Sequence, residues 1–158
     1  MAKGGLSFEG GLDATGLRLA VIVARFNAHV TGKLYDGCRA ELGAHGLDID
    51  TLAMVEVPGC FELPIVAKTL AASGGYDAVI CLGAVIRGDT PHFDYVSSET
   101  ASGLQRAALD TGVPVIFGVL TTDNDDQAIE RAGGGHKGRD AALTAIEMVH
   151  TMRRLSRD

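Results

Sequence analysis

The sequence predicts an α/β fold, in which a four-stranded parallel sheet is covered by helices on both faces to give a three-layer αβα sandwich. Four β-branched apolar runs alternate with segments of helical periodicity, and this alternation is typical of parallel sheets. The run over residues 78–86 is apolar almost without interruption, as expected of a strand that is buried on both faces. These two observations place the chain in the α/β class.

The first half of the chain contains two of the expected strands. Residues 17–24 form the first strand, and an apolar side chain then recurs at every fourth position from Val30 to Leu42. This spacing predicts a helix that ends at the glycines that follow it. Residues 49–57 form the second predicted strand, and the helix expected over residues 61–73 ends before a pair of glycines.

The second half of the chain repeats the pattern. Residues 78–86 are the third predicted strand, and residues 96–110 are expected to form a helix with a serine near its start. The fourth strand is predicted over residues 113–120. Two helical segments end the chain, over residues 125–132 and 138–154, with three consecutive glycines between them.

The length and composition indicate a single folded domain. A chain of 158 residues with 46% hydrophobic residues is long enough for one domain with a core and too short for two ordinary domains. Residues 1–16 contain five glycines and few apolar residues, so we expect them to form an arm or a frayed end. Residues 17–158 are the predicted domain.

The charge and the cysteine content exclude several classes of protein. The net charge is −6, and no stripe of lysine and arginine is present to neutralise nucleic-acid phosphates or an anionic membrane. No stretch approaches the ~18 apolar residues that a membrane span needs, and the N-terminal sequence has no hydrophobic signal region. We therefore expect a cytoplasmic protein. Three cysteines without CxxC spacing predict reduced thiols.

Familiar ligand-binding motifs are absent from the sequence. The first strand runs into Ala24-Arg25-Phe26-Asn27 and not into GxGxxG, which argues against a dinucleotide-binding fold. Lys137 precedes a glycine, where the lysine of a P-loop would precede serine or threonine. The histidine and acidic residues lack metal-site spacing such as HExxH, so we expect no catalytic metal.

Polar and aromatic residues gather where the predicted strands end. In a parallel sheet the carboxyl ends of the strands share one edge, and ligands bind there. An aromatic ring can stack on a planar ligand, and the free N–H groups of a helix N-terminus can bind its carbonyl or phosphate groups. The candidate residues are Phe26 and Asn27 after the first strand, Gly59, Cys60 and Glu62 after the second, residues 87–92 after the third, and Phe117 with residues 121–123 on the fourth.

Several candidate residues also have an ordinary structural interpretation. Phe26 and Phe117 are of a type that is more often found in the core. Arg131 and Lys137 are, from spacing alone, a solvated helix face and a cation at a helix start. Cys60 has no partner base that the sequence identifies, so we interpret it as a small residue and not as a nucleophile.

Four motifs stand in a fixed order along the chain. They are Ala-Arg-Phe-Asn at 24–27, Val-Pro-Gly-Cys-Phe-Glu-Leu-Pro at 57–64, Leu-Gly-Ala-Val-Ile-Arg-Gly-Asp-Thr-Pro-His-Phe-Asp-Tyr-Val at 82–96, and Phe-Gly-Val-Leu-Thr-Thr at 117–122 with Gln-Ala-Ile-Glu-Arg-Ala-Gly at 127–133. Their order and spacing resemble the successive signatures of the lumazine synthase (6,7-dimethyl-8-ribityllumazine synthase) family, over about residues 17–154.

This resemblance implies a flavodoxin-like fold and a transferase of riboflavin biosynthesis. The implied reaction condenses 5-amino-6-(ribitylamino)uracil with 3,4-dihydroxy-2-butanone 4-phosphate, releases phosphate and water, and needs no cofactor. The alternative is a non-catalytic relative that binds lumazine or a flavin, or that serves as a scaffold. Such a relative would be expected to lose the phosphate-binding and proton-transfer groups, whereas His92 and Arg131 are both present.

The resemblance also assigns roles to individual residues. His92 matches the proton-transfer residue, and Phe117 and Lys137 match positions that a neighbouring subunit contributes. The residues that match the binding positions for the pyrimidine and its ribityl chain are Phe26, Asn27, Cys60, Phe61, Glu62, Ala84, Val85 and Ile86. The residues that match the phosphate-binding positions are Gly88, Asp89, Thr90 and Arg131.

The implied assembly is a homopentamer with active sites between neighbouring subunits. The glycine-rich arm is expected to add to a neighbour's sheet, and the small side chains Ala142, Ala145 and Val149 are expected to permit close helix packing. The connector over residues 133–138 is shorter than in many shell-forming relatives. This difference favours an isolated pentamer over a decamer or a larger shell.

Overall fold

Four parallel strands form one sheet in the order β2-β1-β3-β4 in the computed structural model, which describes residues 12–156. The strands are β1 (Leu19–Ala24), β2 (Ala53–Val57), β3 (Ala78–Ile86) and β4 (Val115–Thr122). β1 and β3 are the central strands, and β2 and β4 are the two edges. The predicted four-stranded parallel sheet is confirmed.

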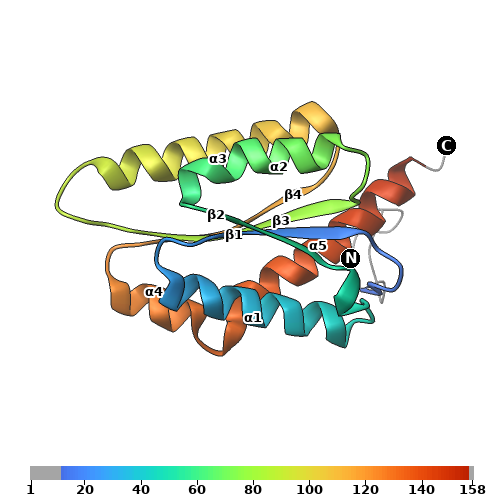
Figure 1. Cartoon of the computed structure of the whole chain (residues 1–158), viewed down its shortest axis with the longest axis horizontal. Coiled ribbons are helices and arrows are strands. Elements are labelled where there is room, and N and C mark those ends of the chain that lie inside the picture. Colours follow the sequence, from blue (N-terminus) through green and yellow to red (C-terminus); the bar gives the residue numbers. More distant parts are fainter. Residues whose placement is uncertain (1–11, 157–158) are drawn as a thin grey trace, which may run out of the picture.

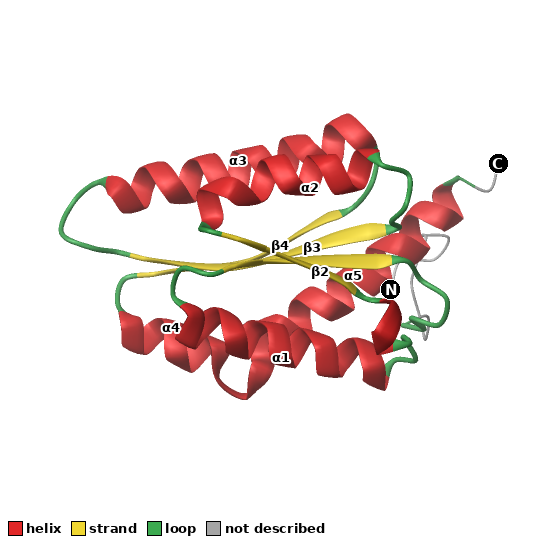
Figure 2. Ribbon diagram, viewed as in Figure 1, coloured by secondary structure: helices red, strands yellow, loops and turns green. Residues whose placement is uncertain are grey.

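Helices cover both faces of this sheet, as Figures 1 and 2 show. One layer consists of α2 (Leu63–Ala72) and α3 (His92–Thr111), and the other consists of α1 (Ala28–Ala44), α4 (Asp125–Ala132) and α5 (His136–Leu155). The loops that leave β1, β3 and β4 lie together at the left of Figure 1. The three-layer αβα architecture is therefore confirmed, and it places the carboxyl ends of the strands at one end of the molecule.

The sheet is buried because its strands present apolar side chains to both helical layers. Ile80 and Leu82 of β3 belong to a cluster that includes Leu34 of α1, while Val79 and Cys81 belong to a second cluster with Leu63 and Leu104. Successive residues of a strand point to opposite faces, so one apolar run supplies both clusters. This explains why the run over residues 78–86 has no polar face.

The second predicted strand is shorter than its apolar pattern suggests. Residues 49–57 were expected to be extended, but Ile49–Thr51 form a short 3₁₀ helix and β2 begins only at Ala53. The Asp48 carboxylate accepts a hydrogen bond from the Asp50 N–H at 3.1 Å. This side-chain cap favours a tight turn over an extended chain.

Helix α3 begins earlier than predicted, at His92 and not near residue 96. The Pro91 carbonyl accepts a hydrogen bond from the Asp94 N–H at 3.0 Å and closes the first turn. Ser97 is therefore not a cap, and its buried hydroxyl has no hydrogen-bond partner within residues 12–156. The apolar pattern missed the first turn because His92 and Tyr95 line a cavity while Phe93 packs against the second cluster, so no single apolar face marks the turn.

The small side chains of α5 pack inside the chain. Ala142, Ala145 and Val149 are buried in the same cluster as Leu34 of α1. A methyl group at Gly138 would collide with the Leu34 carbonyl, so α5 and α1 approach as closely as a glycine permits. The expected close helix packing of this stripe is confirmed, and its partner is α1 of the same chain.

The predicted arm lies mostly outside the described residues, which begin at residue 12. The part that is described packs against the domain. Ala14 is fully buried and its N–H donates to the His45 carbonyl at 2.9 Å, while His150 Nε2 lies 2.6 Å from the Asp13 carbonyl oxygen. β1 then begins at Leu19, two residues after the predicted start at 17.

Candidate active site

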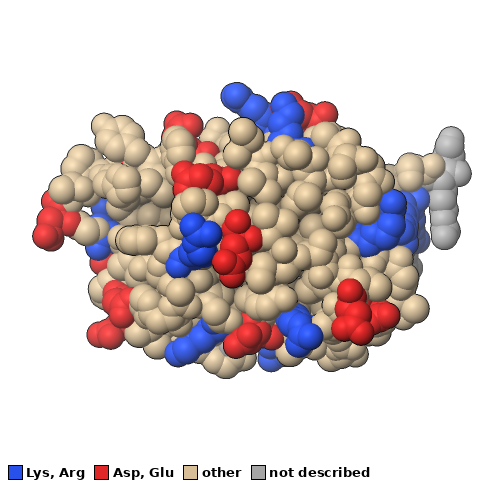
Figure 3. All heavy atoms as spheres, viewed as in Figure 1, with Lys and Arg blue, Asp and Glu red and all other residues tan. Residues whose placement is uncertain are grey.

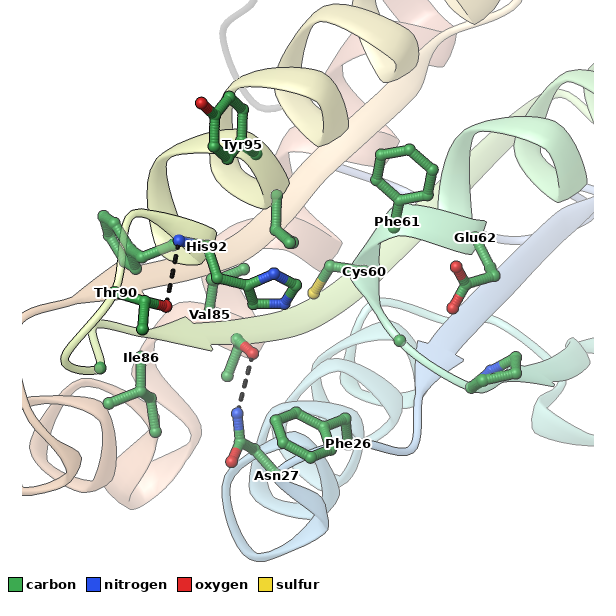
Figure 4. Close-up of a pocket in the computed structure, with 16 residues that line it drawn as sticks. Phe26, Asn27, Cys60, Phe61, Glu62, Val85, Ile86, Thr90, His92 and Tyr95 are labelled. Atoms are coloured by element: carbon green, nitrogen blue, oxygen red, sulfur yellow. Dashed lines mark hydrogen bonds between the residues drawn. The ribbon is translucent and has the colours of Figure 1, made fainter.

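A cavity of about 770 Å³ opens at the carboxyl ends of the strands. The residues that line it come from the end of β3, from the loops after β1, β2 and β3 and from the start of α3, and Figure 4 shows them. The lining residues that the sequence predicted are Phe26, Asn27, Gly59, Cys60, Phe61, Glu62, Ala84, Val85, Ile86, Gly88, Thr90 and His92. The lining residues that the sequence did not predict are Pro58, Phe93, Tyr95 and Val96.

Asn27 joins the loop after β1 to the end of β3. It has φ 66° and ψ 46°, and among the described residues no other residue besides glycine has a positive φ. Asparagine tolerates this left-handed conformation better than most residues. The Asn27 side-chain amide donates to the Ala84 carbonyl at 3.0 Å, so this side chain is fixed against the end of β3.

Phe26 lies beside Asn27 with its ring open to the cavity. The side chain is 72% exposed, so the alternative that Phe26 is a core residue is wrong. Its backbone N–H donates to the Pro58 carbonyl at 3.0 Å, which ties the loop after β1 to the loop after β2. A fixed backbone with an exposed ring is suited to stacking on a flat ligand.

Cys60 lies at the start of a short 3₁₀ helix, Cys60–Glu62, that precedes α2. Burial raises the pKa of its thiol to about 11, and the nearby Glu62 carboxylate adds to this rise against a lowering hydrogen bond from the Ala84 backbone. The thiol is therefore protonated at neutral pH, which favours a binding role over a nucleophilic one. Gly83 has no side chain, and a methyl group there would collide with the Cys60 sulfur.

His92 is the first residue of α3 and faces the cavity. Its backbone N–H lies 3.4 Å from Thr90 Oγ1, and in Figure 4 its imidazole points over β3 toward Cys60. Tyr95 and Val96 lie three and four positions later, so they share the helix face of His92 and also line the cavity. Only the correct helix start would have revealed these two residues from the sequence.

Phe117 and Lys137 lie apart from this cavity. They line a second cavity, of about 410 Å³, together with residues of α3 and α5. Phe117 was expected near the carboxyl end of its strand, but it pairs with Cys81 in the middle of β3. Phe117 is 42% exposed on an edge strand, so it is not a core residue either.

Arg131 and Asp89 do not line the cavity within residues 12–156. Arg131 lies in the last turn of α4 and is exposed. Asp89 is exposed in the turn between β3 and α3. A single chain therefore gathers the predicted residues for the pyrimidine and its ribityl chain, whereas it brings together only part of the predicted phosphate site.

Basic and acidic side chains are interspersed over the face shown in Figure 3. No group of three or more histidine, cysteine, aspartate or glutamate residues between residues 12 and 156 could hold a metal ion. In the same part of the chain, no helix has the length and apolar character needed to cross a membrane.

Comparison with known families agrees with this geometry. The family model described as 6,7-dimethyl-8-ribityllumazine synthase matches residues 16–153, which is most of the chain. The match includes all the loops that form the cavity, as well as β4, α4 and the greater part of α5. The chain belongs to the 6,7-dimethyl-8-ribityllumazine synthase family, whose members are transferases of riboflavin biosynthesis.

Proposed function

We propose that the protein condenses 5-amino-6-(ribitylamino)uracil with 3,4-dihydroxy-2-butanone 4-phosphate to give 6,7-dimethyl-8-ribityllumazine, two water molecules and inorganic phosphate. The observation that carries this proposal is the composition of the cavity. One cavity contains an exposed aromatic ring, a carboxylate, part of the turn at a helix N-terminus and a histidine, contributed by Phe26, Glu62, Gly88 with Thr90, and His92. These groups suit a flat polar ring, a hydroxylated chain, a phosphate and a proton.

The pyrimidine is assigned to the part of the cavity near Phe26. The exposed Phe26 ring can stack on the heterocycle, and the end of β3 presents backbone groups along its edge. The Glu62 carboxylate can accept hydrogen bonds from the hydroxyl groups of the ribityl chain. Asn27 supports this site indirectly, because its amide holds the Ala84 carbonyl.

The phosphate is assigned to the turn that leads into α3. This helix has 20 residues, and the partial positive charge at its N-terminus favours an anion. Arg131 is proposed to complete the site with a bidentate contact. Stabilising the charge on the departing phosphate lowers the barrier of the elimination step.

His92 is proposed to move protons during the reaction. The amine attacks the ketone, water leaves to form an imine, phosphate is eliminated, and ring closure releases the second water. Each step transfers protons and none transfers electrons, so one imidazole at the reacting end of the cavity can serve the whole sequence. Holding two reactants together supplies much of the remaining acceleration.

The complete site is proposed to lie between two subunits of a homopentamer in the cytoplasm. Phe117 and Lys137 are together on the β4 edge, away from the cavity of their own chain. In a ring with head-to-tail contacts, the edge of one subunit can face the cavity of the next. Such a contact would also cover the exposed edge strand.

The test is to incubate the purified protein with both substrates, and to follow lumazine absorbance and phosphate release together. We expect one phosphate per lumazine formed. The alternative of a non-catalytic binding protein predicts that lumazine binds to the protein but does not form faster than in the uncatalysed reaction. Light scattering should give about five times the chain mass of 16.4 kDa; a fully active monomer would contradict the shared site.

A further inference from the structure

Arg87 connects three segments around the turn that we assign to phosphate. Its backbone N–H donates to the Thr122 carbonyl at 2.8 Å, and its Nε donates to Asp123 Oδ1 at 3.1 Å. Its Nη1 lies 3.6 Å from Asp94 Oδ1, and its guanidinium carbon lies 4.3 Å from the centre of the Phe93 ring. One residue therefore links the end of β3 to the turn after β4 and to the first turn of α3.

These contacts hold the Arg87 side chain outside the cavity. Ile86 and Gly88 line the cavity, whereas Arg87 between them does not. The guanidinium faces two carboxylates and stacks on an aromatic ring, and a lysine cannot reproduce this planar geometry. Any effect of Arg87 on the substrates must therefore act through the residues that it holds.

The turn that Arg87 contacts after β4 is itself fastened to α4. The Asp123 backbone N–H donates to Gln127 Oε1 at 2.9 Å. Arg131 follows Gln127 by four positions on α4, so the two residues share one face of the helix. The contacts thus run from Arg87, which directly precedes the turn over residues 88–90, through Asp123 and Gln127 to the helix that carries Arg131.

We propose that Arg87 is a positioning residue that holds the turn over residues 88–90 in register with α4, so that this turn and Arg131 meet the same phosphate group. The inference rests on the proposed function, because that function places phosphate at this turn. The ion pairs of Arg87 are exposed, with side-chain exposures of 47% for Arg87 and 69% for Asp123. Exposed pairs add little to folding stability, so the expected effect is on geometry.

The test compares three variants with a matched control. Arg87→Gln removes both the charge and the planar guanidinium group. Arg87→Lys keeps only the charge, and Asp123→Asn removes one of the carboxylates that pair with Arg87. The control is Arg153→Gln, because Arg153 is a similarly exposed arginine, at 53%, whose Nη2 lies 3.1 Å from the Asp77 carboxylate. It lies outside the candidate active site.

We expect Arg87→Gln to raise the KM for the butanone phosphate about tenfold and the KM for the pyrimidine less than about twofold. Arg87→Lys should keep most of this defect, and the double variant with Asp123→Asn should be no worse than Arg87→Gln alone. Arg153→Gln should match the unchanged enzyme. Full rescue by lysine, equal weakening of both substrates, or additive effects of the two substitutions would each overturn the proposal.

A second measurement separates this inference from the proposed function. The Asp94 and Tyr95 N–H groups donate to the Pro91 carbonyl at 3.0 and 3.4 Å in the first turn of α3. Without substrates, Arg87→Gln should speed hydrogen exchange at these two amides several-fold, and Arg153→Gln should not. Unchanged exchange would overturn the positioning role. If the unmodified protein makes no lumazine, the proposed function is overturned. The exchange measurement needs no substrate, so it would still test whether Arg87 holds the first turn of α3.

Discussion

The cavity at the carboxyl ends of the strands and the exposed edge of β4 are built in different ways. The cavity is formed by loops whose backbones are tied to one another, as Phe26 is to Pro58 and Asn27 is to Ala84. The edge presents Phe117 on a strand that is paired on one side only, beside Lys137 of α5. A concave surface with fixed walls can bind a ligand in one chain, whereas a half-exposed aromatic on a strand edge is typical of a surface that another chain covers.

This contrast teaches that one chain carries two unequal parts of the proposed site. The family signatures run through both parts, so the sequence alone does not separate them. The separation comes from the positions of the residues along the strands. Phe117 pairs with Cys81 in mid-strand, whereas the cavity begins at Ala84 near the end of β3. The predictions below test whether the two parts work together, in order of decreasing effect.

The largest loss of activity is expected from a substitution in the cavity. His92→Ala should lower turnover about tenfold to a thousandfold, because it removes the proposed proton carrier while water and spontaneous condensation supply part of the rate. Cys60→Ser should remain active, since burial keeps the thiol protonated. The measurement is the steady-state rate of lumazine formation; loss of activity in Cys60→Ser would identify a nucleophilic thiol.

Mixing two impaired variants tests whether the edge of one chain completes the cavity of another. His92→Ala damages only the cavity, and Phe117→Ala damages only the edge. Refolded together in equal amounts, they should regain about a quarter of the unmodified activity, because about one interface in four joins an intact cavity to an intact edge. Each variant refolded alone is the control, and a mixture no better than the average of the two would argue that the site belongs to one chain.

Arg131→Ala should weaken the phosphate substrate selectively. Removal of a charged partner should raise the KM for the butanone phosphate about tenfold, while affinity for a ribityl-pyrimidine analogue changes little. Kinetics with each substrate varied in turn, together with calorimetric titration of the analogue, measure the two effects. Equal weakening of both ligands would show that Arg131 does not serve phosphate alone.

Gly138→Ala should disturb the packing of α5 against α1 without changing the cavity at the strand ends. The added methyl group would collide with the Leu34 carbonyl, so we expect a loss of about 1–3 kcal/mol in the free energy of unfolding and displacement of the adjacent Lys137. Gly32→Ala is the matched helical control, because nothing lies within 4 Å of the added group, and it should gain about 0.5 kcal/mol. Urea unfolding at one subunit concentration measures both; equal stability of the two variants would contradict the close contact.

The smallest effect, on stability and not on turnover, is expected from a substitution of Asp77 at the opposite end of the sheet. Burial raises the pKa of Asp77, but hydrogen bonds from the Arg18 backbone and side chain and the charge of Arg153 outweigh burial and lower the pKa below 3.8. Asp77 therefore adds stability above pH 3.8, and this stability is lost as the pH falls through its lowered value. Asp77→Asn should cost about 1 kcal/mol at pH 7 and progressively less in acid, with unchanged turnover. A loss that does not depend on pH would contradict a charge effect.

The sequence determined the fold class and most of the cavity. Strand character shows in runs such as residues 78–86 because burial on both faces requires apolar side chains at every position. Parallel strands all end at the same edge, so the residues that follow three of them, including Phe26, Cys60 and His92, could be predicted to meet. The helix start at His92 could not be predicted from the same pattern, because polar and aromatic residues alternate in the first turn of α3 and none of them is fully buried.

Only the tertiary structure decided which distant residues touch. The order β2-β1-β3-β4 puts β4 at the edge and exposes Phe117, and a strand's place in a sheet leaves little trace in its own sequence. The Asn27 amide bonds to Ala84, and Arg87 bonds to Asp123. Hydrophobic periodicity reports whether a side chain is buried, whereas a polar contact between loops depends on backbone positions that only the assembled sheet supplies.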